Sequence, residues 1–151
     1  MDFKQIDLGD LDDVMRLGRV MYEESGMLGD FAEDRCRFTA TIFIASPNVF
    51  SWGAWVDREL AGFMAGEVMD HCASDRLIGR EHFLYVSPDK RGLFASKGLM
   101  KRFEDWCRDR GASSTFMDIS SDIDQENVVK LMKIFGYKEA GILMEKEIED
   151  A

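Results

Sequence analysis

Residues 91–96 combine features that suit the binding of a phosphate or pyrophosphate. Arg91 carries a positive charge, and Gly92 beside it can adopt backbone conformations that other residues avoid. The apolar stretch 83–86 before them is typical of a buried strand, and an amphipathic helix is predicted after them. A sharp turn from strand to helix leaves backbone N–H groups unpaired at the positive end of the helix dipole. The segment is therefore a candidate phosphate cradle, and an ordinary structural turn is the alternative.

The elements on either side of this cradle have recognisable ends. Pro88 should end the strand, because proline donates no hydrogen bond to a sheet. The helix is predicted to begin at Ala95 or Ser96 and to stop at Gly111. Its apolar face is expected to consist of Leu99, Met100, Phe103, Trp106 and Cys107.

The chain before the cradle alternates between helix and strand signals. A short strand over 2–7 precedes a helix from about Asp10 to Glu24, and a second helix is predicted after Asp30. The buried face of this second helix is expected to be Ala32, Cys36, Thr39 and Phe43. Strands over 49–56 and 60–69 form a hairpin, and a polar loop over 70–79 leads to the strand before the cradle.

The full order of elements is β-α-α-β-β-β-α-β-α-β. A run of strands followed by β-α-β units indicates an α/β fold with a mixed, mostly antiparallel sheet and helices on both faces. A chain of 151 residues is long enough for one domain with its own core and short for two, so residues 1–151 are predicted to form a single domain.

Composition narrows the classes of partner. The formal net charge is −10, from 29 acidic and 19 basic residues, which repels nucleic acid and anionic membranes. Positive charge gathers between Arg76 and Arg110, around the cradle, as an anionic cofactor would require. The sequence shows neither a membrane-spanning run nor a signal pattern, so a cytoplasmic protein is expected. The acidic balance also serves solubility.

Three cysteines, Cys36, Cys72 and Cys107, lie far apart and are odd in number. Reduced thiols in a cytoplasmic protein are the natural interpretation. His71 next to Cys72, with His82 further on, has no recognised zinc-binding spacing. We therefore expect no metal site.

The segment Val86-Ser-Pro-Asp-Lys-Arg91-Gly92-x-x-Ala95-x-x-x-Leu99 resembles the acetyl-CoA loop of the GNAT N-acetyltransferases, commonly written Arg/Gln-x-x-Gly-x-Gly/Ala. Arg91 and Gly92 fit this pattern, whereas Phe94 stands at the first glycine and Ser96 at the second small residue. Residues 111–148 resemble the C-terminal part of the family, with a strand, a short helix ending in Gly136-Tyr137, and a final strand. The whole is most similar to the compact GNATs often encoded by phages.

This resemblance implies acetyl-CoA as cofactor, held where the central strand splays from the next. The pantetheine arm would pair with the strand at 83–86, and an N–H near Leu84 or Val86 would stabilise the thioester oxyanion. The pyrophosphate would sit on the N–H groups of residues 91–96. Lys97 either screens the pyrophosphate or is simply solvated, and Phe94 packs on the core or reaches over the cofactor. The implied cofactor-binding residues are Leu84, Tyr85, Val86, Arg91, Gly92, Leu93, Phe94, Ala95, Ser96, Lys97 and Asn127.

The implied reaction is direct attack of a primary amine, of a small molecule, peptide or protein, on the thioester. Glu81 and His82 are the candidate general bases, and because strand residues alternate faces, at most one should point to the cleft. The tyrosine that many members use as general acid corresponds to Met132 here. Tyr85 or water would then protonate the thiolate, or no acid is needed, or catalysis is weak.

The acceptor pocket is expected at the loop after the first helix. Glu24-Ser25 resembles a Glu-Ser pair of the compact members, and Asp118 is the third candidate substrate-binding residue. Further carboxylates expected near this pocket are Glu67, Asp70 and Asp122. The alternatives are a weak or inactive module of the same fold that binds acyl-CoA, and an enzyme acting on nucleic acid, against which the net charge argues. The sequence is compatible with both a monomer and a homodimer.

Overall fold

The computed structural model describes residues 1–27, 29–119, 123–144 and 146. Its strands form one five-stranded sheet in the order β1-β2-β3-β4-β5, antiparallel except for the last pair, which is parallel. The strands are β1 (Asp2–Gln5), β2 (Val49–Val56), β3 (Glu59–Asp70), β4 (Leu77–Val86) and β5 (Ala112–Phe116). The helices are α1 (Leu11–Ser25), α2 (Glu33–Ala45), α3 (Leu93–Asp109) and α4 (Gln125–Ile134), with short 3-10 turns η1 (Leu8–Asp10) and η2 (Pro88–Lys90).

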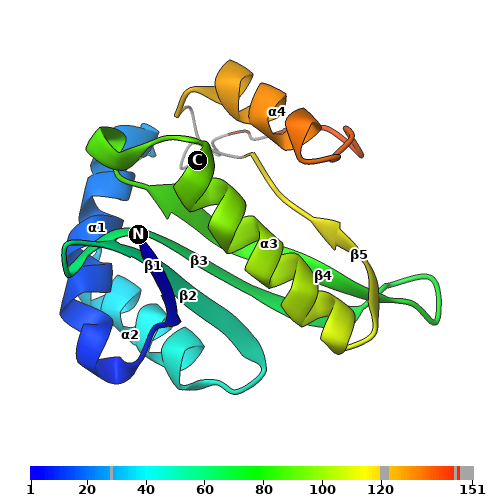
Figure 1. Cartoon of the computed structure of the whole chain (residues 1–151), viewed down its shortest axis with the longest axis horizontal. Coiled ribbons are helices and arrows are strands. Elements are labelled where there is room, and N and C mark those ends of the chain that lie inside the picture. Colours follow the sequence, from blue (N-terminus) through cyan, green and yellow to red (C-terminus); the bar gives the residue numbers. More distant parts are fainter. Residues whose placement is uncertain (28, 120–122, 145, 147–151) are drawn as a thin grey trace, which may run out of the picture.

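Helices cover both faces of this sheet, as the element order predicts (Figure 1). Alternate residues of a strand point to opposite faces, so β3 sends Met64 into a core with Leu99 and Phe103 of α3. Its neighbour Phe63 joins the other core, with Leu17 of α1. The predicted fold class, a mixed and mostly antiparallel sheet between helices, is confirmed.

Glycines at two positions allow close contact between α3 and the strands beneath it. A Cβ atom added to Gly66 would come within 2.6 Å of the Phe103 ring. A Cβ atom on Gly98 of α3 would come within 2.1 Å of the Phe3 ring on β1. These two positions cannot hold a larger residue without movement of an aromatic ring, the buried Phe103 or the half-buried Phe3. They fix the depth at which α3, and therefore its N-terminus, sits on the sheet.

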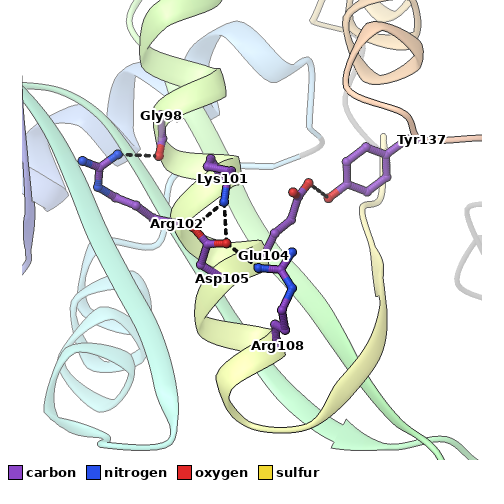
Figure 2. A network of polar contacts seen from close by, with 7 residues as sticks. All are labelled: Gly98, Lys101, Arg102, Glu104, Asp105, Arg108 and Tyr137. Atoms are coloured by element: carbon purple, nitrogen blue, oxygen red, sulfur yellow. Dashed lines mark hydrogen bonds and ion pairs between the residues drawn. The ribbon is translucent and has the colours of Figure 1, made fainter.

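The outer face of α3 is polar and holds the segment after α4 (Figure 2). Lys101 and Arg108 both pair with Asp105 between them. The Tyr137 hydroxyl donates to Glu104 of α3 at 3.1 Å and lies 3.0 Å from Thr115 of β5. The loop after α4 is thereby attached to both elements.

Three local predictions differ from the structure. Helix α3 begins at Leu93, two residues early, because the turn η2 ends at Lys90 and leaves less loop than expected. The predicted face of the second helix is only partly buried: Cys36, Thr39 and Phe43 are half-buried, and Ala32, the N-cap residue of α2, is exposed. The strand expected after Gly136-Tyr137 is not formed by the described residues 138–144, whose Ile142 and Leu143 are exposed.

Candidate active site

A cleft of about 410 Å³ opens where β4 and β5 separate. The two strands pair only from Leu77 to Arg80 on β4, and Figure 1 shows them diverging beyond that point. Among the described residues no strand pairs with the outer edge of positions 81–86, whose other edge pairs with β3. The predicted splay is therefore present. The walls of the cleft come from β4, α1, the start of α3, the segment after β5, and α4.

Glu81 lies at the head of this cleft, the point where β4 and β5 separate just after Arg80. Its side chain is only 7% exposed. Its Oε2 atom accepts a hydrogen bond of 3.2 Å from the backbone N–H of Asp118. Burial raises the pKa of Glu81 to about 7, and the Asp118 hydrogen bond only partly opposes this effect. A carboxylate with a pKa near neutrality is suited to accept and release protons at physiological pH.

His82 also lines the cleft, although strict alternation would send either it or Glu81 away. The reason is a bulge: Ala65 of β3 faces Phe83 and Gly66 faces Glu81, which leaves His82 without a partner in the register. The His82 ring is held by Glu67, with 2.8 Å between Nε2 and Oε1, and lies against Phe43 of α2. Sequence alternation could not reveal this bulge.

Tyr85, Glu24 and Arg91 form one hydrogen-bonded group at the cleft. The Tyr85 hydroxyl donates to Glu24 Oε2 at 2.6 Å, and Arg91 Nη2 donates to the same oxygen at 2.5 Å. Arg91 Nε also donates to the carbonyl of Val86 at 3.2 Å. Arg91 lowers the pKa of Glu24, while burial and Glu24 raise the pKa of Tyr85, so the phenol stays protonated. Arg91 is predicted to bind the cofactor, Glu24 to bind the acceptor and Tyr85 to act in catalysis. The structure joins all three by hydrogen bonds.

The N-terminus of α3 faces the cleft through Arg91, Gly92 and Ser96. Gly92 is the N-cap residue and supplies no side-chain cap, and the first turn contains no acidic residue. The first N–H groups of a helix without such a cap suit an anion such as a pyrophosphate. Ala95 is buried in the core beneath this turn, and Lys97 is exposed. Phe94 is 84% exposed, so the expectation that it packs on the core is wrong.

The opposite wall is built by α4 and the segment before it. Asn127 lines the cleft, and its amide donates to Asp124 at 2.9 and 3.0 Å. Met132, at the position of the expected tyrosine, is buried and also lines the cleft. Leu84 and Val86 face these residues from β4.

Of the three predicted acceptor residues, Ser25 and Asp118 line the cleft. Glu24 reaches it through its hydrogen bonds with Tyr85 and Arg91. Ser25 is buried and lines the cleft, but its hydroxyl donates to the Tyr22 carbonyl at 2.8 Å. Asp118 lines the cleft and accepts a hydrogen bond from Arg80 at 2.9 Å. Asp70 lies outside the lining, and Asp122 is outside the described residues.

The apolar residues of the cleft lining could not be predicted from the sequence. These residues lie on different segments and carry no motif, and only their place at the ends of predicted elements could have suggested them. They include Met21, Met27, Phe83, Met117 and Ile123.

Two features are absent from the part of the chain that the structure describes. Its helices include none with both the length and the apolar character needed to cross a bilayer. Within the same residues, no three or more His, Cys, Asp or Glu side chains are grouped closely enough to hold a metal ion.

Comparisons with known proteins agree with this architecture. The family model for the acetyltransferase (GNAT) family matches residues 12–137. No curated protein matches the sequence. Among solved structures, a predicted acetyltransferase from Clostridium acetobutylicum with acetyl-CoA has a TM-score of 0.78 at 13% identity, covering 97% of this chain and 95% of that one.

Two further solved structures carry a named activity. The aminoglycoside N-acetyltransferase AAC(6')-Iy in complex with CoA has a TM-score of 0.77 at 15% identity, covering 99% of this chain and 95% of that one. The ribosomal-protein-alanine N-acetyltransferase from Brucella melitensis biovar Abortus 2308 has a TM-score of 0.72 at 19% identity, covering 98% and 100%. At these identities the structures support the fold, and the family model shows the family. The chain belongs to the GNAT acetyltransferase family, whose cofactor is acetyl-CoA.

Proposed function

We propose that this protein transfers the acetyl group of acetyl-CoA to a primary amine by direct attack, without a covalent enzyme intermediate. Acetyl-CoA supplies the acetyl group as a thioester. The N-terminus of α3 would hold the pyrophosphate, and the unpaired edge of β4 at residues 82–86 would align the pantetheine arm by backbone hydrogen bonds. A backbone N–H near Leu84 or Val86 would stabilise charge on the thioester oxygen.

Glu81 is the proposed general base. It would take a proton from the ammonium group, directly or through one water molecule, so that the neutral amine attacks as the C–S bond breaks. The observation that carries the proposal is the position of this buried carboxylate, with its pKa near 7, at the head of the cleft. His82 is the alternative base, because Glu67 holds its Nε2 atom and thereby leaves Nδ1 as the nitrogen that would accept a proton.

No side chain is needed to protonate the leaving thiolate. The Tyr85 hydroxyl already donates to Glu24, and Met132 occupies the position of the expected tyrosine. Water, or the proton taken from the amine, would serve instead.

Thermal unfolding tests the cofactor site before any amine is known. Acetyl-CoA at a hundredfold excess over its dissociation constant should stabilise the protein by about 2.7 kcal/mol, because it binds only the folded state. Adenosine at the same concentration is the control, since it lacks the pyrophosphate and the pantetheine arm. If acetyl-CoA left the melting temperature unchanged, the turn at 91–96 would be structural and the enzyme proposal would be dropped.

A second candidate is a module that binds acyl-CoA and does not turn it over. It is favoured by Met132 and by the commitment of Tyr85 to Glu24, which together leave the cleft without a positioned tyrosine acid. A melting shift with acetyl-CoA, combined with no release of CoA thiol for any amine, would favour the module over the enzyme.

A further inference from the structure

The two faces of β4 divide the cleft into two halves. Leu84 and Val86 belong to the core on the α3 side, where the pyrophosphate would sit. Phe83 and Tyr85 belong to the core on the α1 side. If acetyl-CoA occupies the α3 side, the α1 side is the half left for the acceptor.

The acceptor half is lined by apolar side chains from four separate segments. Met21 of α1, Phe83 of β4 and Ile123 before α4 all line the cleft and pack against the same hydrophobic cluster. Met27, in the loop after α1, lines it as well and is 49% exposed. An acceptor bound here would place apolar surface, rather than charge, against these side chains.

The carboxylates around this half are already paired. Glu24 is bound by Arg91 at 2.5 Å, and Asp118 is bound by Arg80 at 2.9 Å. Glu67 is hydrogen-bonded to His82 at 2.8 Å. The two arginine pairs use negative charge that a second or third ammonium group of a substrate would need, and the Glu67 carboxylate is committed to the His82 ring by a hydrogen bond.

Two other carboxylates line the cleft. Glu81 lies at its head, where the reacting nitrogen must come. Asp124 lies on the opposite wall, at the start of α4, next to Asn127. Among the described residues, Glu81 and Asp124 are therefore the lining carboxylates without a cationic partner, and Asp124 accepts from the Asn127 amide instead.

We infer that the acceptor is an amine with a single basic nitrogen on an apolar body, and not a polycation such as a polyamine or an aminoglycoside. This inference rests on the proposed function, since it names the substrate class of the same site. A polycation would have to desolvate its extra ammonium groups against methionine and phenylalanine side chains, with Asp124 as the one other lining carboxylate that has no cationic partner among the described residues. A monoamine with an aromatic or aliphatic body would bury that body in the acceptor half and leave its nitrogen beside Glu81.

The test compares kcat/KM at saturating acetyl-CoA, followed by release of CoA thiol. Phenethylamine and hexylamine represent apolar monoamines, and spermidine and kanamycin represent polycations. We expect the monoamines to exceed both polycations by about tenfold or more. Met27→Glu, which adds a carboxylate at the acceptor half, should shift the ratio toward spermidine. Met69→Glu is the matched control, because Met69 is 40% exposed on β3 and lies outside the cleft lining.

The outcomes distinguish a wrong substrate class from a wrong assignment of acetyltransferase activity. Turnover of spermidine or kanamycin at or above that of the monoamines would overturn the inferred substrate class and leave the acetyltransferase intact. An equal change in the ratio for Met27→Glu and Met69→Glu would also overturn it, because net charge alone would then explain the effect. No turnover of any amine, despite a melting shift with acetyl-CoA, would overturn the acetyltransferase and the substrate class together.

Discussion

Replacing Glu81 by Gln should make the stability of the protein less dependent on pH. The pKa of Glu81 is raised from the ordinary 4.5 to about 7 by burial, so the folded protein binds this proton more tightly than the unfolded chain. The resulting stability is fully present below pH 4.5 and is lost as the pH rises through 7. The pKa difference is worth about 3 kcal/mol in total, most of which would be lost between pH 5 and pH 8.

The glutamine variant keeps the side-chain oxygen that accepts from the Asp118 N–H group and cannot ionise. Urea unfolding at pH 5 and pH 8 therefore measures the effect without any substrate. Wild type should lose about 2–3 kcal/mol more than Glu81→Gln over this interval. Glu59→Gln, which removes an exposed carboxylate at the start of β3, should behave like wild type. If Glu81→Gln followed wild type within about 0.5 kcal/mol, the buried position of Glu81 and its raised pKa would both be refuted.

The same residue sets the expected pH profile of the reaction. In wild type, kcat/KM should rise with pH through an apparent pKa near 7, as Glu81 becomes able to accept a proton. In Glu81→Gln this limb should disappear, and the rate should fall by on the order of 10²–10⁴-fold with little change in affinity for acetyl-CoA. Equal turnover in the two proteins would dismiss Glu81 as the base.

Other parts of the structure give three further predictions. Arg91→Glu should weaken acetyl-CoA binding at least about tenfold in calorimetry, because it places negative charge beside the N-terminus of α3; unchanged affinity would remove Arg91 from the cradle. Gly98→Ala should lower the unfolding free energy by about 1–3 kcal/mol, since the added Cβ meets the Phe3 ring, and a variant as stable as wild type would contradict that packing. Cys72 is exposed and should react with a thiol reagent at pH 8, whereas Cys107, buried and with its pKa raised to about 12, should react only on unfolding.

The sequence predicts those parts of the fold that depend on neighbouring residues. The strand, turn and helix between Phe83 and Asp109 follow from local periodicity and from Pro88 and Gly92, and the hairpin turn at Asp57 is likewise local. A short apolar run such as Ile142 to Met144 has the composition of a strand, but that composition does not specify which strand, if any, the run pairs with.

The candidate site depends on contacts between distant residues, which local patterns do not encode. Arg91 and Glu24 are 67 positions apart, so nothing in the sequence around either one indicates their ion pair. The backbone N–H group that donates to the buried Glu81 carboxylate belongs to Asp118, 37 positions later in the chain. The residue types of the site could therefore be predicted, and their pairing could not.

The unpaired edge of β4 has a consequence for how the cleft wall is held. A sheet normally gains stability along the whole length of each strand pair, but here β5 shares only the first part of β4 before the strands separate. Beyond that point, β5 and α4 rely on side-chain contacts such as the bond between Tyr137 and Glu104. A pantetheine arm lying along residues 82–86 would supply the backbone hydrogen bonds that a neighbouring strand supplies elsewhere. Ligand binding and the local folding of this wall would then be coupled, with acetyl-CoA acting as the missing strand of the sheet.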